Sequence, residues 1–464
     1  MHVAVLTIGG EELTVLDVEP TWTLDELRDR VAELPICASL ELGKTPRIFH
    51  GHIELQPGVS LESIGVADES KLTLVVTSIM RPIPAGDDGI REMWRGGVQE
   101  PPLFSVEDPF GSASAARFWS GSSRQSVCTL EDHGGSLQSV ALSPDGKLVL
   151  TASRDRTAKT WKVETGVCVN TFRGHGRAVY SAYFSQDGRL ALTASEDHTS
   201  KVWSVDTGRC RRTFEGHGGP VQSAVFSEDA IMAYTASRDG TARVWRISQD
   251  EVIHVLQGHG RAVLSALPSA SGELLVTASE DLTAKIWSLA TGECLRTFER
   301  HGGFVTSAVF SSDDECVLTA SRDGTASIWR ASTGECALSL RGHAGALLSA
   351  AYSNDDATVL TASEDRTARL WNAKSGECLH TLGRLAGLVL SAVFSPDSTL
   401  VITALMDGTA QIWRVDTGEC LATLQSHAGV RGHGEACISA IISPDGNLAI
   451  TASEDRTAKI WKPR

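Results

Sequence analysis

The chain from residue 124 to residue 464 is dominated by short apolar runs that alternate with polar turns. Within one period, β-prone runs such as residues 178–184 and 190–195 are separated by turns that contain Gly and Asp. Each period holds four such runs, which predicts four short antiparallel strands per repeat. A unit of this size cannot bury both of its faces alone. Neighbouring units must therefore pack face to face, and radial closure leaves only short, protected edges.

Tryptophan marks the repeat with a constant spacing. Eight tryptophans are separated by 42 residues six times and by 48 residues once: Trp161, Trp203, Trp245, Trp287, Trp329, Trp371, Trp413 and Trp461. Each ends a near copy of T-A-S-x-D-x-T-A-x-x-W, as in residues 151–161. A histidine lies 28 residues before the tryptophan in seven copies, and Leu385 takes its place in copy seven. The spacing predicts eight homologous units.

These motifs resemble the WD-repeat β-propeller family, whose period is roughly 40 to 45 residues. The resemblance covers residues 124–464 and implies an all-β, eight-bladed propeller. The sequence departs from the family pattern because the residue after each tryptophan is never Asp. The expected fold is unchanged, since the tryptophan and the turn aspartate persist.

The ends of the repeat region indicate how the ring closes. The last copy has only three residues after Trp461 and so lacks an outer strand, whereas residues 126–130 form an outer strand with no repeat before them. We predict that this strand completes blade eight and closes the ring by pairing with the free edge of the last copy. Trp119 lies 42 residues before Trp161 and is interpreted as a relic of a decayed strand, not as a ninth blade.

Each copy contains a hydroxyl, a carboxylate and usually an imidazole, as in His175, Thr193 and Asp197 beside Trp203. A catalytic triad is one asymmetric site, whereas this set recurs in every unit. The resemblance implies a structural hydrogen-bond chain from Trp through Thr and His to Asp. We therefore expect no enzyme activity. We also expect no metal, because the histidines are spread one per blade and no H-E-x-x-H or C-x-x-C motif occurs. Residues 38–45 lack the first Gly of a phosphate-binding loop, so no cofactor is expected.

Residues 1–77 have the pattern of a small α+β domain. Thr23 and Glu26 form a capping box before a helix with one apolar face. The segments M-H-V-A-V-L-T-I-G-G, R-I-F-H-G-H and S-K-L-T-L-V-V resemble ubiquitin, which implies a β-grasp fold. The residues that match the apolar recognition patch of ubiquitin are Ile8, Ile48 and Val75. They are expected to engage a receptor of the ubiquitin pathway, although alternation also allows a role in the core.

This ubiquitin-like domain is expected to be a fixed module and not a transferable tag. Residues 76–78 are Val, Thr and Ser where ubiquitin has its terminal Gly-Gly, so conjugation has no chemical handle. The domain contains five basic and thirteen acidic residues, which favours partners with a basic surface. Residues 78–123 are rich in Pro, Gly, Ser and Ala and are predicted to be a flexible linker.

The residue before each turn aspartate alternates in charge around the expected ring. These residues are Arg154, Glu196, Arg238, Glu280, Arg322, Glu364, Met406 and Glu454. They resemble the family's interaction sites on the top face. Surface ion pairs are worth only about 0–1 kcal/mol each, so stability is a weak reason for this pattern. We expect these residues to bind a protein client.

Copy seven breaks the repeat at several positions. It has Leu385 for His, Leu405 for Ser and Met406 for the expected Arg, with Leu388 nearby, and six extra residues follow at about 426–431. Apolar residues gathered near one rim indicate a docking patch, and simple decay of one blade explains them equally well. Our hypothesis is that a protein partner docks over blades seven and eight.

Composition narrows the partners and the compartment. A net charge of -15 and a pI near 5.4 argue against nucleic acid binding. The chain has no apolar run of about 20 residues and no basic leader, so we expect a soluble intracellular protein that does not enter membranes. Six cysteines share one outer-strand position on different blades and are expected to be reduced, as in the cytoplasm or nucleus: Cys168, Cys210, Cys294, Cys336, Cys378 and Cys420.

Two functions fit these patterns. The first is a monomeric, non-enzymatic scaffold whose propeller binds a client while the ubiquitin-like domain engages a receptor. The second is a substrate receptor of a cullin-type ubiquitin ligase, a family that often uses a W-D-x-R ending in a propeller blade. Residues 461–464 keep the Trp and Arg of that ending but lack its acidic residue. A hydrolase would need a unique nucleophile in the channel of the ring.

Overall fold

The computed structural model divides the chain into two units, Met1–Ile79 and Met80–Arg464, and each is described by itself. The residues that the structure describes are 2–6, 12–17, 47–50, 53–54, 71–75, 80–81, 103–104, 126–249, 251–383, 385–424 and 435–462. Within these segments, no helix combines the length and the hydropathy of a membrane span.

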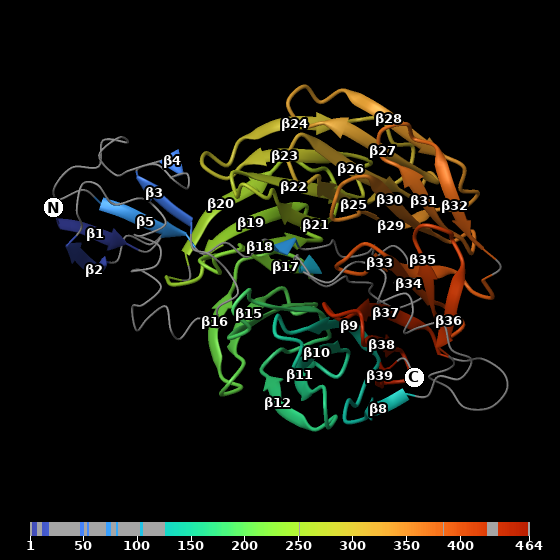
Figure 1. Ribbon diagram of the computed structural model, residues 1–464, viewed down its shortest axis with the longest axis horizontal. Helices are drawn as coiled ribbons and strands as arrows, with labels where there is room; N and C mark the ends of the chain where they lie inside the picture. Colours follow the sequence, from blue (N-terminus) through green and yellow to red (C-terminus); the bar gives the residue numbers. More distant parts are fainter. Residues whose placement is uncertain are drawn as a thin grey trace. The chain divides into compact units, whose positions relative to one another are not determined.

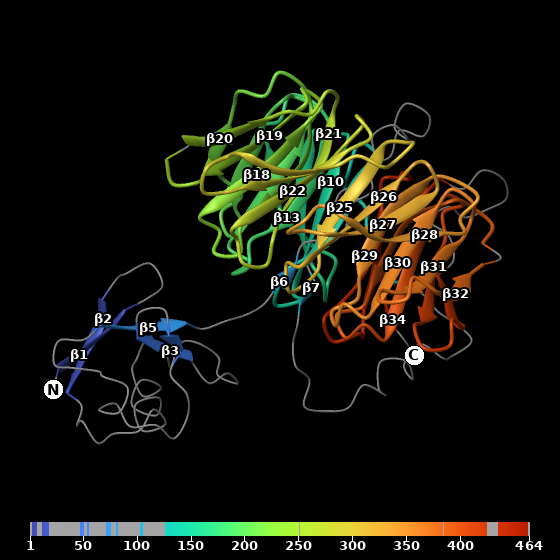
Figure 2. The same cartoon turned by 90° about the horizontal axis from the view of Figure 1, so that it is seen from above.

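The second unit contains eight four-stranded sheets arranged as the blades of a ring (Figure 1). Blade one has the antiparallel order β9 (Leu137–Leu142), β10 (Leu148–Ser153), β11 (Thr157–Lys162) and β12 (Cys168–Arg173). The first strands of successive blades contact one another all the way round, and the first strand of blade eight contacts β9. These strands therefore line the centre, and the other strands of each blade follow outwards, as β9 to β12 do in Figure 1. Figure 2 shows the same ring in the view turned by 90°.

The remaining blades repeat this plan. Blades two to four contain β13 (Val179–Phe184), β14 (Leu190–Ser195), β15 (Ser200–Ser204), β16 (Cys210–Phe214), β17 (Val221–Phe226), β18 (Met232–Ser237), β19 (Thr241–Arg246), β20 (Glu251–Gln257), β21 (Val263–Pro268), β22 (Leu274–Ser279), β23 (Ala284–Ser288) and β24 (Cys294–Phe298). Blades five to seven contain β25 (Val305–Phe310), β26 (Cys316–Ser321), β27 (Thr325–Arg330), β28 (Cys336–Arg341), β29 (Leu347–Tyr352), β30 (Thr358–Ser363), β31 (Ala368–Asn372), β32 (Cys378–Leu382), β33 (Val389–Phe394), β34 (Leu400–Leu405), β35 (Ala410–Arg414) and β36 (Cys420–Leu424).

Blade eight joins the two ends of the propeller. Its strands are β37 (Cys437–Ile442), β38 (Ala449–Ser453), β39 (Ala458–Trp461) and β8 (Ser126–Leu130), in that order. The outer strand β8 runs antiparallel to β39, with Leu130 opposite Ala458. The predictions of eight blades and of closure by the strand at 126–130 are confirmed. At this seam Lys159, whose side chain is 4% exposed, pairs with Asp132 in the loop after β8.

Burial follows the position of a strand within its blade. All six residues of the innermost strand β17 are buried, whereas in the outermost strand β12 only Phe172 is buried. Inner strands are covered by blades on both sides, which explains why their sequences are almost continuously apolar or small. The core consists of these strands together with the repeated tryptophans, of which Trp203, Trp245, Trp287 and Trp371 are among the largest fully buried side chains.

The first unit contains one mixed sheet in the order β2-β1-β5-β3-β4. Its strands are β1 (His2–Leu6), β2 (Glu12–Asp17), β3 (Arg47–His50), β4 (Ile53–Glu54) and β5 (Lys71–Val75). The central pair β1 and β5 is parallel, and the neighbouring pairs are antiparallel. Ile48 lies in β3 and Val75 in the adjacent β5. Ile8 and the helix predicted from Thr23 lie outside the described residues.

A short strand pair lies within the segment predicted to be the linker. Its strands are β6 (Met80–Arg81) and β7 (Leu103–Phe104), which pair antiparallel. Trp119 and the other residues between these strands and β8 lie outside the described residues.

Candidate protein-binding face

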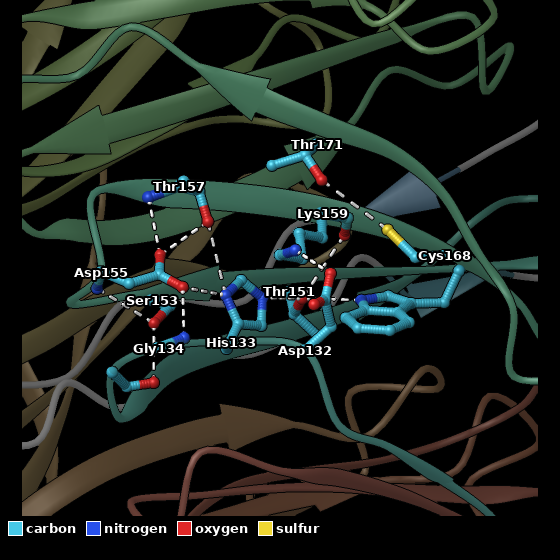
Figure 3. A network of polar contacts seen from close by, with 12 residues as sticks. Asp132, His133, Gly134, Thr151, Ser153, Asp155, Thr157, Lys159, Cys168 and Thr171 are labelled. Carbon is cyan, nitrogen blue, oxygen red and sulfur yellow. Dashed lines mark hydrogen bonds and ion pairs between the residues drawn. The ribbon is translucent and has the colours of Figure 1, made fainter.

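Each of the first six blades is held by a chain of four side chains, shown for blade one in Figure 3. Trp161 Nε1 donates to Thr151 Oγ1 over 2.9 Å. Thr151 Oγ1 lies 2.7 Å from His133 Nε2, and His133 Nδ1 lies 2.7 Å from Asp155 Oδ2. The indole can only donate, so the threonine hydroxyl accepts from Trp161. The ionised carboxylate of Asp155 can only accept, so His133 Nδ1–H donates to it, and His133 Nε2 faces the threonine hydroxyl.

The same chain recurs with nearly constant geometry. Across the six blades, the distance from His Nδ1 to Asp Oδ2 lies between 2.7 and 3.0 Å. The distance from His Nε2 to Thr Oγ1 lies between 2.7 and 2.8 Å. Both imidazole nitrogens are engaged inside the blade, so none of these histidines is available as a general base in this geometry. The structural role that the resemblance implied is confirmed for these blades.

The aspartate ties two loops together at one face of the ring. Asp155 Oδ2 accepts from the backbone N–H of Gly134, before the inner strand, and Asp155 Oδ1 accepts from Thr157 N and Thr157 Oγ1, after the turn. Arg156 at the turn tip has a φ of 72°, a conformation that the capped turn imposes on a non-glycine residue. We call the face that carries these loops the upper face.

Burial and hydrogen bonding shift the pKa values of several histidines and aspartates in these chains. Burial lowers the pKa of His175, His217 and His343 below its ordinary value, although the neighbouring aspartates act against this shift. Burial alone would raise the pKa of Asp197, but hydrogen bonds from His175, Thr199 and the backbone N–H of Gly176 outweigh it and hold that pKa well below its usual range. A neutral imidazole beside an ionised carboxylate is consistent with both directions.

Blade seven keeps the fold without the imidazole. Leu385 occupies the histidine position, is buried, and packs in one cluster with Leu405 and Trp413. Trp413 Nε1 still donates to Thr403 Oγ1 over 3.1 Å. In blade eight Trp461 donates to Thr451, and His433 lies outside the described residues.

The upper face brings the eight predicted client-binding residues into one ring. The backbone N–H of each of these residues donates to a carbonyl in the loop before the inner strand of the same blade, over distances between 2.8 and 3.0 Å: Arg154, Glu196, Arg238, Glu280, Arg322, Glu364, Met406 and Glu454. All eight are half-buried. This constant bond holds them at equivalent positions beside the centre, so they surround the mouth of the ring.

Two large side chains lie in the same loops, at the position that accepts those bonds. The residues there are Ser136, Ala178, Pro220, Ala262, Phe304, Ala346, Leu388 and Ala436. Phe304 contacts two guanidinium groups, with Arg261 at 6.0 Å and Arg322 at 5.7 Å from the ring centre. Phe304 was not among the predicted site residues. The sequence could have identified it, because this position holds one aromatic residue among mostly small ones when the copies are aligned at the 42-residue period.

The predicted apolar patch of copy seven is smaller than expected. Leu385 and Leu405 are 6% and 0% exposed, so their inclusion in a surface patch is wrong. They fill the space beside Trp413 that an imidazole and a serine occupy in other blades. Leu388 and Met406 are partly exposed at the mouth and pack on buried residues of blades six to eight.

The cysteines and the possible metal ligands of the described residues form no further site. Nine cysteines in this part of the chain are free, and Cys210, Cys294 and Cys420 are exposed. Among the described residues, no group of three His, Cys, Asp or Glu side chains is arranged to hold a metal ion.

Comparison with known proteins agrees with this architecture. Residues 136–414 match the family model described as IFT122 first beta-propeller, which is more than half of the chain. The chain belongs to this family of WD-repeat propellers. Residues 418–462 of the WD-repeat propeller match a second model, the WD domain, G-beta repeat. Propellers of this kind generally serve as non-catalytic scaffolds for protein interactions.

A solved structure extends the likeness to the whole ring. The WD-repeat propeller is similar to the crystal structure of the computationally designed Ika8 protein, with 25% identity and a TM-score of 0.65. The match covers 73% of this chain and 99% of the designed chain. No curated protein matches the chain.

Proposed function

We propose that this protein is a scaffold whose propeller captures a protein client at the mouth of the upper face. One observation carries the proposal. The hydrogen-bond chains behind the mouth are nearly identical in blades one to six, whereas the half-buried residues at the mouth alternate between Arg and Glu and then change to Met406. The repeated chains hold each blade together, so variation at equivalent half-buried positions of the mouth is where a partner can be recognised.

Several features favour binding over catalysis. The repeated His, Thr and Asp sets do not resemble a nucleophilic site, because Thr193 accepts from Trp203 while His175 engages Asp197. Charged residues that are half-buried at a rim contribute little to stability as ion pairs, as for Arg177 and Glu196 at 3.6 Å. They do contribute to the choice of partner and the rate of association.

We further propose that residues 1–77 form a ubiquitin-like domain that engages receptors of the ubiquitin pathway. The sheet order β2-β1-β5-β3-β4, with β1 parallel to β5, supports a β-grasp arrangement. Ile8, Ile48 and Val75 are the residues proposed to contact the receptor. Residues 76–78 offer no terminal Gly-Gly, so the domain would act while attached to the propeller.

The scaffold is tested by capturing clients on the purified full-length chain from cell extract, with crosslinking and mass spectrometry. The double variant Leu388→Asp, Met406→Asp is expected to lose the client, and the Ile48→Ala, Val75→Ala double variant is expected to lose only the receptor. Arg209→Asp, in the exposed turn between β15 and β16 on the face opposite to the mouth, is the control for a new negative charge on the propeller. A Leu388→Asp, Met406→Asp chain that is folded by circular dichroism and retains the same client would disprove the docking site.

A substrate receptor of a cullin-type ligase is the second candidate. The Trp and Arg at residues 461–464 favour it, and the missing acidic residue between them counts against it. Retention of a ligase core during purification of the full-length chain separates the two, because a simple scaffold would not retain it.

A further inference from the structure

The residues around the centre of the ring differ in polarity from one side of the ring to the other. The second residue of each inner strand shows this difference, and these residues are, from blade one to blade eight, Gln138, Tyr180, Gln222, Leu264, Thr306, Leu348, Leu390 and Ile438. It is therefore polar in blades one to three and aliphatic in blades six to eight. Each strand pairing skips this residue, as where Val389 lies opposite Leu405 and Ser391 opposite Ala404, which leaves Leu390 out of the ladder. Such a bulge redirects the side chain of the skipped residue.

The aliphatic side forms one continuous cluster across three blades. Leu348, Leu390 and Ile438 pack together with Ala436, and all four are buried. Residues from three successive inner strands can only meet at the inner edge of the ring. Leu388 and Met406 pack on this cluster and are themselves partly exposed. The partly exposed side chains of Leu388 and Met406 therefore rest on a buried aliphatic cluster at the inner edge of the ring.

The same sector interrupts the charge alternation. Glu196 and Glu280 each have an arginine at the equivalent position of both neighbouring blades. Glu364 and Glu454 instead lie on either side of Met406. Glu435, in the loop before β37, is exposed. Burial raises the pKa of Glu454, Arg154 opposes this shift, and Glu435 adds to it. Arg366 and Arg456 lie at the turn tips, directly after Asp365 and Asp455, so their charges adjoin carboxylates of their own turns.

We propose that this sector, formed by Leu388 and Met406 with Glu364, Glu435 and Glu454 around them, binds a peptide segment of a protein partner that carries an apolar anchor flanked by Lys or Arg. The inference rests on the proposed scaffold function and specifies the chemistry of its client. The apolar anchor covers Leu388 and Met406, which otherwise leave apolar surface in contact with water. The flanking cations approach carboxylates that have no arginine between them.

The chemistry is tested by selecting a phage-displayed library of random twelve-residue peptides on the full-length protein. Phage that also bind a Met406→Arg chain are removed, because this variant restores the residue that the repeat predicts and is expected to fold. Enriched peptides are expected to contain Leu, Met, Ile or Phe flanked by Lys or Arg. Acidic or uncharged enriched sequences, or no enrichment over the Met406→Arg chain, would overturn the proposal.

The best synthetic peptide is then measured by fluorescence anisotropy. Met406→Arg is expected to weaken its binding by about tenfold or more, and Glu454→Gln by a smaller factor. Arg209→Met, in the exposed turn between β15 and β16 on the face opposite to the mouth, is the control and leaves affinity unchanged. Affinity is expected to fall with added salt. Equal affinity for the wild-type and Met406→Arg chains contradicts the proposal.

The two proposals fail in different ways. If the Leu388→Asp, Met406→Asp chain loses its client but the selected peptides lack basic residues, the peptide chemistry is wrong and the scaffold remains. If that variant keeps its client, the docking site is wrong, and so is the inference built on it.

Discussion

At the scale of single residues, the threonine in each blade has the central position because it serves two partners at once. Thr193 Oγ1 accepts from Trp203 Nε1 over 2.9 Å and lies 2.7 Å from His175 Nε2. Both partners are buried, so no water replaces a bond that is lost. The four side chains consequently act as one unit.

Replacing this threonine by valine is expected to be strongly destabilising. Thr193→Val keeps the shape but leaves the buried indole N–H and the imidazole nitrogen without a partner, at about 1–3 kcal/mol for each group. Thr403→Val in blade seven is the internal control, because the indole of Trp413 loses a partner there but no imidazole does. Thermal unfolding by calorimetry should show the larger drop in midpoint for Thr193→Val, and equal drops would contradict this account of the network.

Buried histidines also predict how stability depends on pH. The pKa values of His175, His217 and His343 are lowered from 6.5 in the folded chain, so the unfolded chain binds more protons as the pH falls below that value. The free energy of unfolding is therefore expected to be constant above about pH 7 and to decrease as the pH falls below about 6.5. The aspartates add to the loss only in stronger acid, because the pKa of Asp197 is lowered from 3.8.

The contribution of one histidine to this pH dependence can be measured with a substitution that blade seven already contains. His343→Leu copies Leu385 of blade seven and removes one titrating imidazole. Its unfolding midpoint, measured between pH 5 and pH 8, should vary less with pH than that of the wild-type chain. An identical pH profile would show that His343 does not contribute to the acid sensitivity.

At the scale of elements, the strand β8 decides whether the repeats form a ring. It supplies the outer edge of blade eight, and Leu130 is 1% exposed against the core of blades eight and one. Without it, β39 would present an unpaired edge, a ready template for association with other chains.

Removal of β8 is expected to destabilise the ring and to cause aggregation. A chain that begins at residue 131 loses β8 and the burial of Leu130, and loss of a buried leucine side chain alone is worth about 2–5 kcal/mol. A chain that begins at residue 124 keeps β8 and is the control. Size-exclusion chromatography and thermal unfolding should show aggregation and a lower midpoint only for the shorter chain.

The sequence predicts these elements well because their causes are local and repeated. The spacing of the tryptophans gives the number of blades, and the unpaired outer strand at 126–130 gives the closure. The exposure of individual apolar residues is not local: Leu385 and Leu388 lie three residues apart in the same copy, yet one is buried beside Trp413 and the other reaches the mouth. Phe304 was missed because its contact with Arg261 comes from the preceding blade and depends on the ring geometry, whereas Arg322 lies in its own blade.

At the scale of the whole molecule, the propeller is a repeated framework with one distinctive sector. The backbone is close to eightfold and the hydrogen-bond chain recurs in blades one to six, so this framework does not distinguish those six blades from one another. Among the described residues, Leu388 and Met406 packed on a buried aliphatic cluster occur together only over blades six to eight. A partner that binds this sector would be held at one defined position on the ring.

The proposed scaffold requires both units on one chain, and this requirement gives the last prediction. Client and receptor are expected to be recovered together on the full-length protein, because one chain that carries both binding units raises the effective concentration of each partner near the other. A mixture of separate chains 1–77 and 124–464 should bind each partner singly but should not bridge them. Bead-bound receptor, with the amount of co-captured client quantified by mass spectrometry, measures the bridge. If the separated halves bridge as efficiently as the intact chain, the linkage contributes nothing, and the two units have unrelated functions.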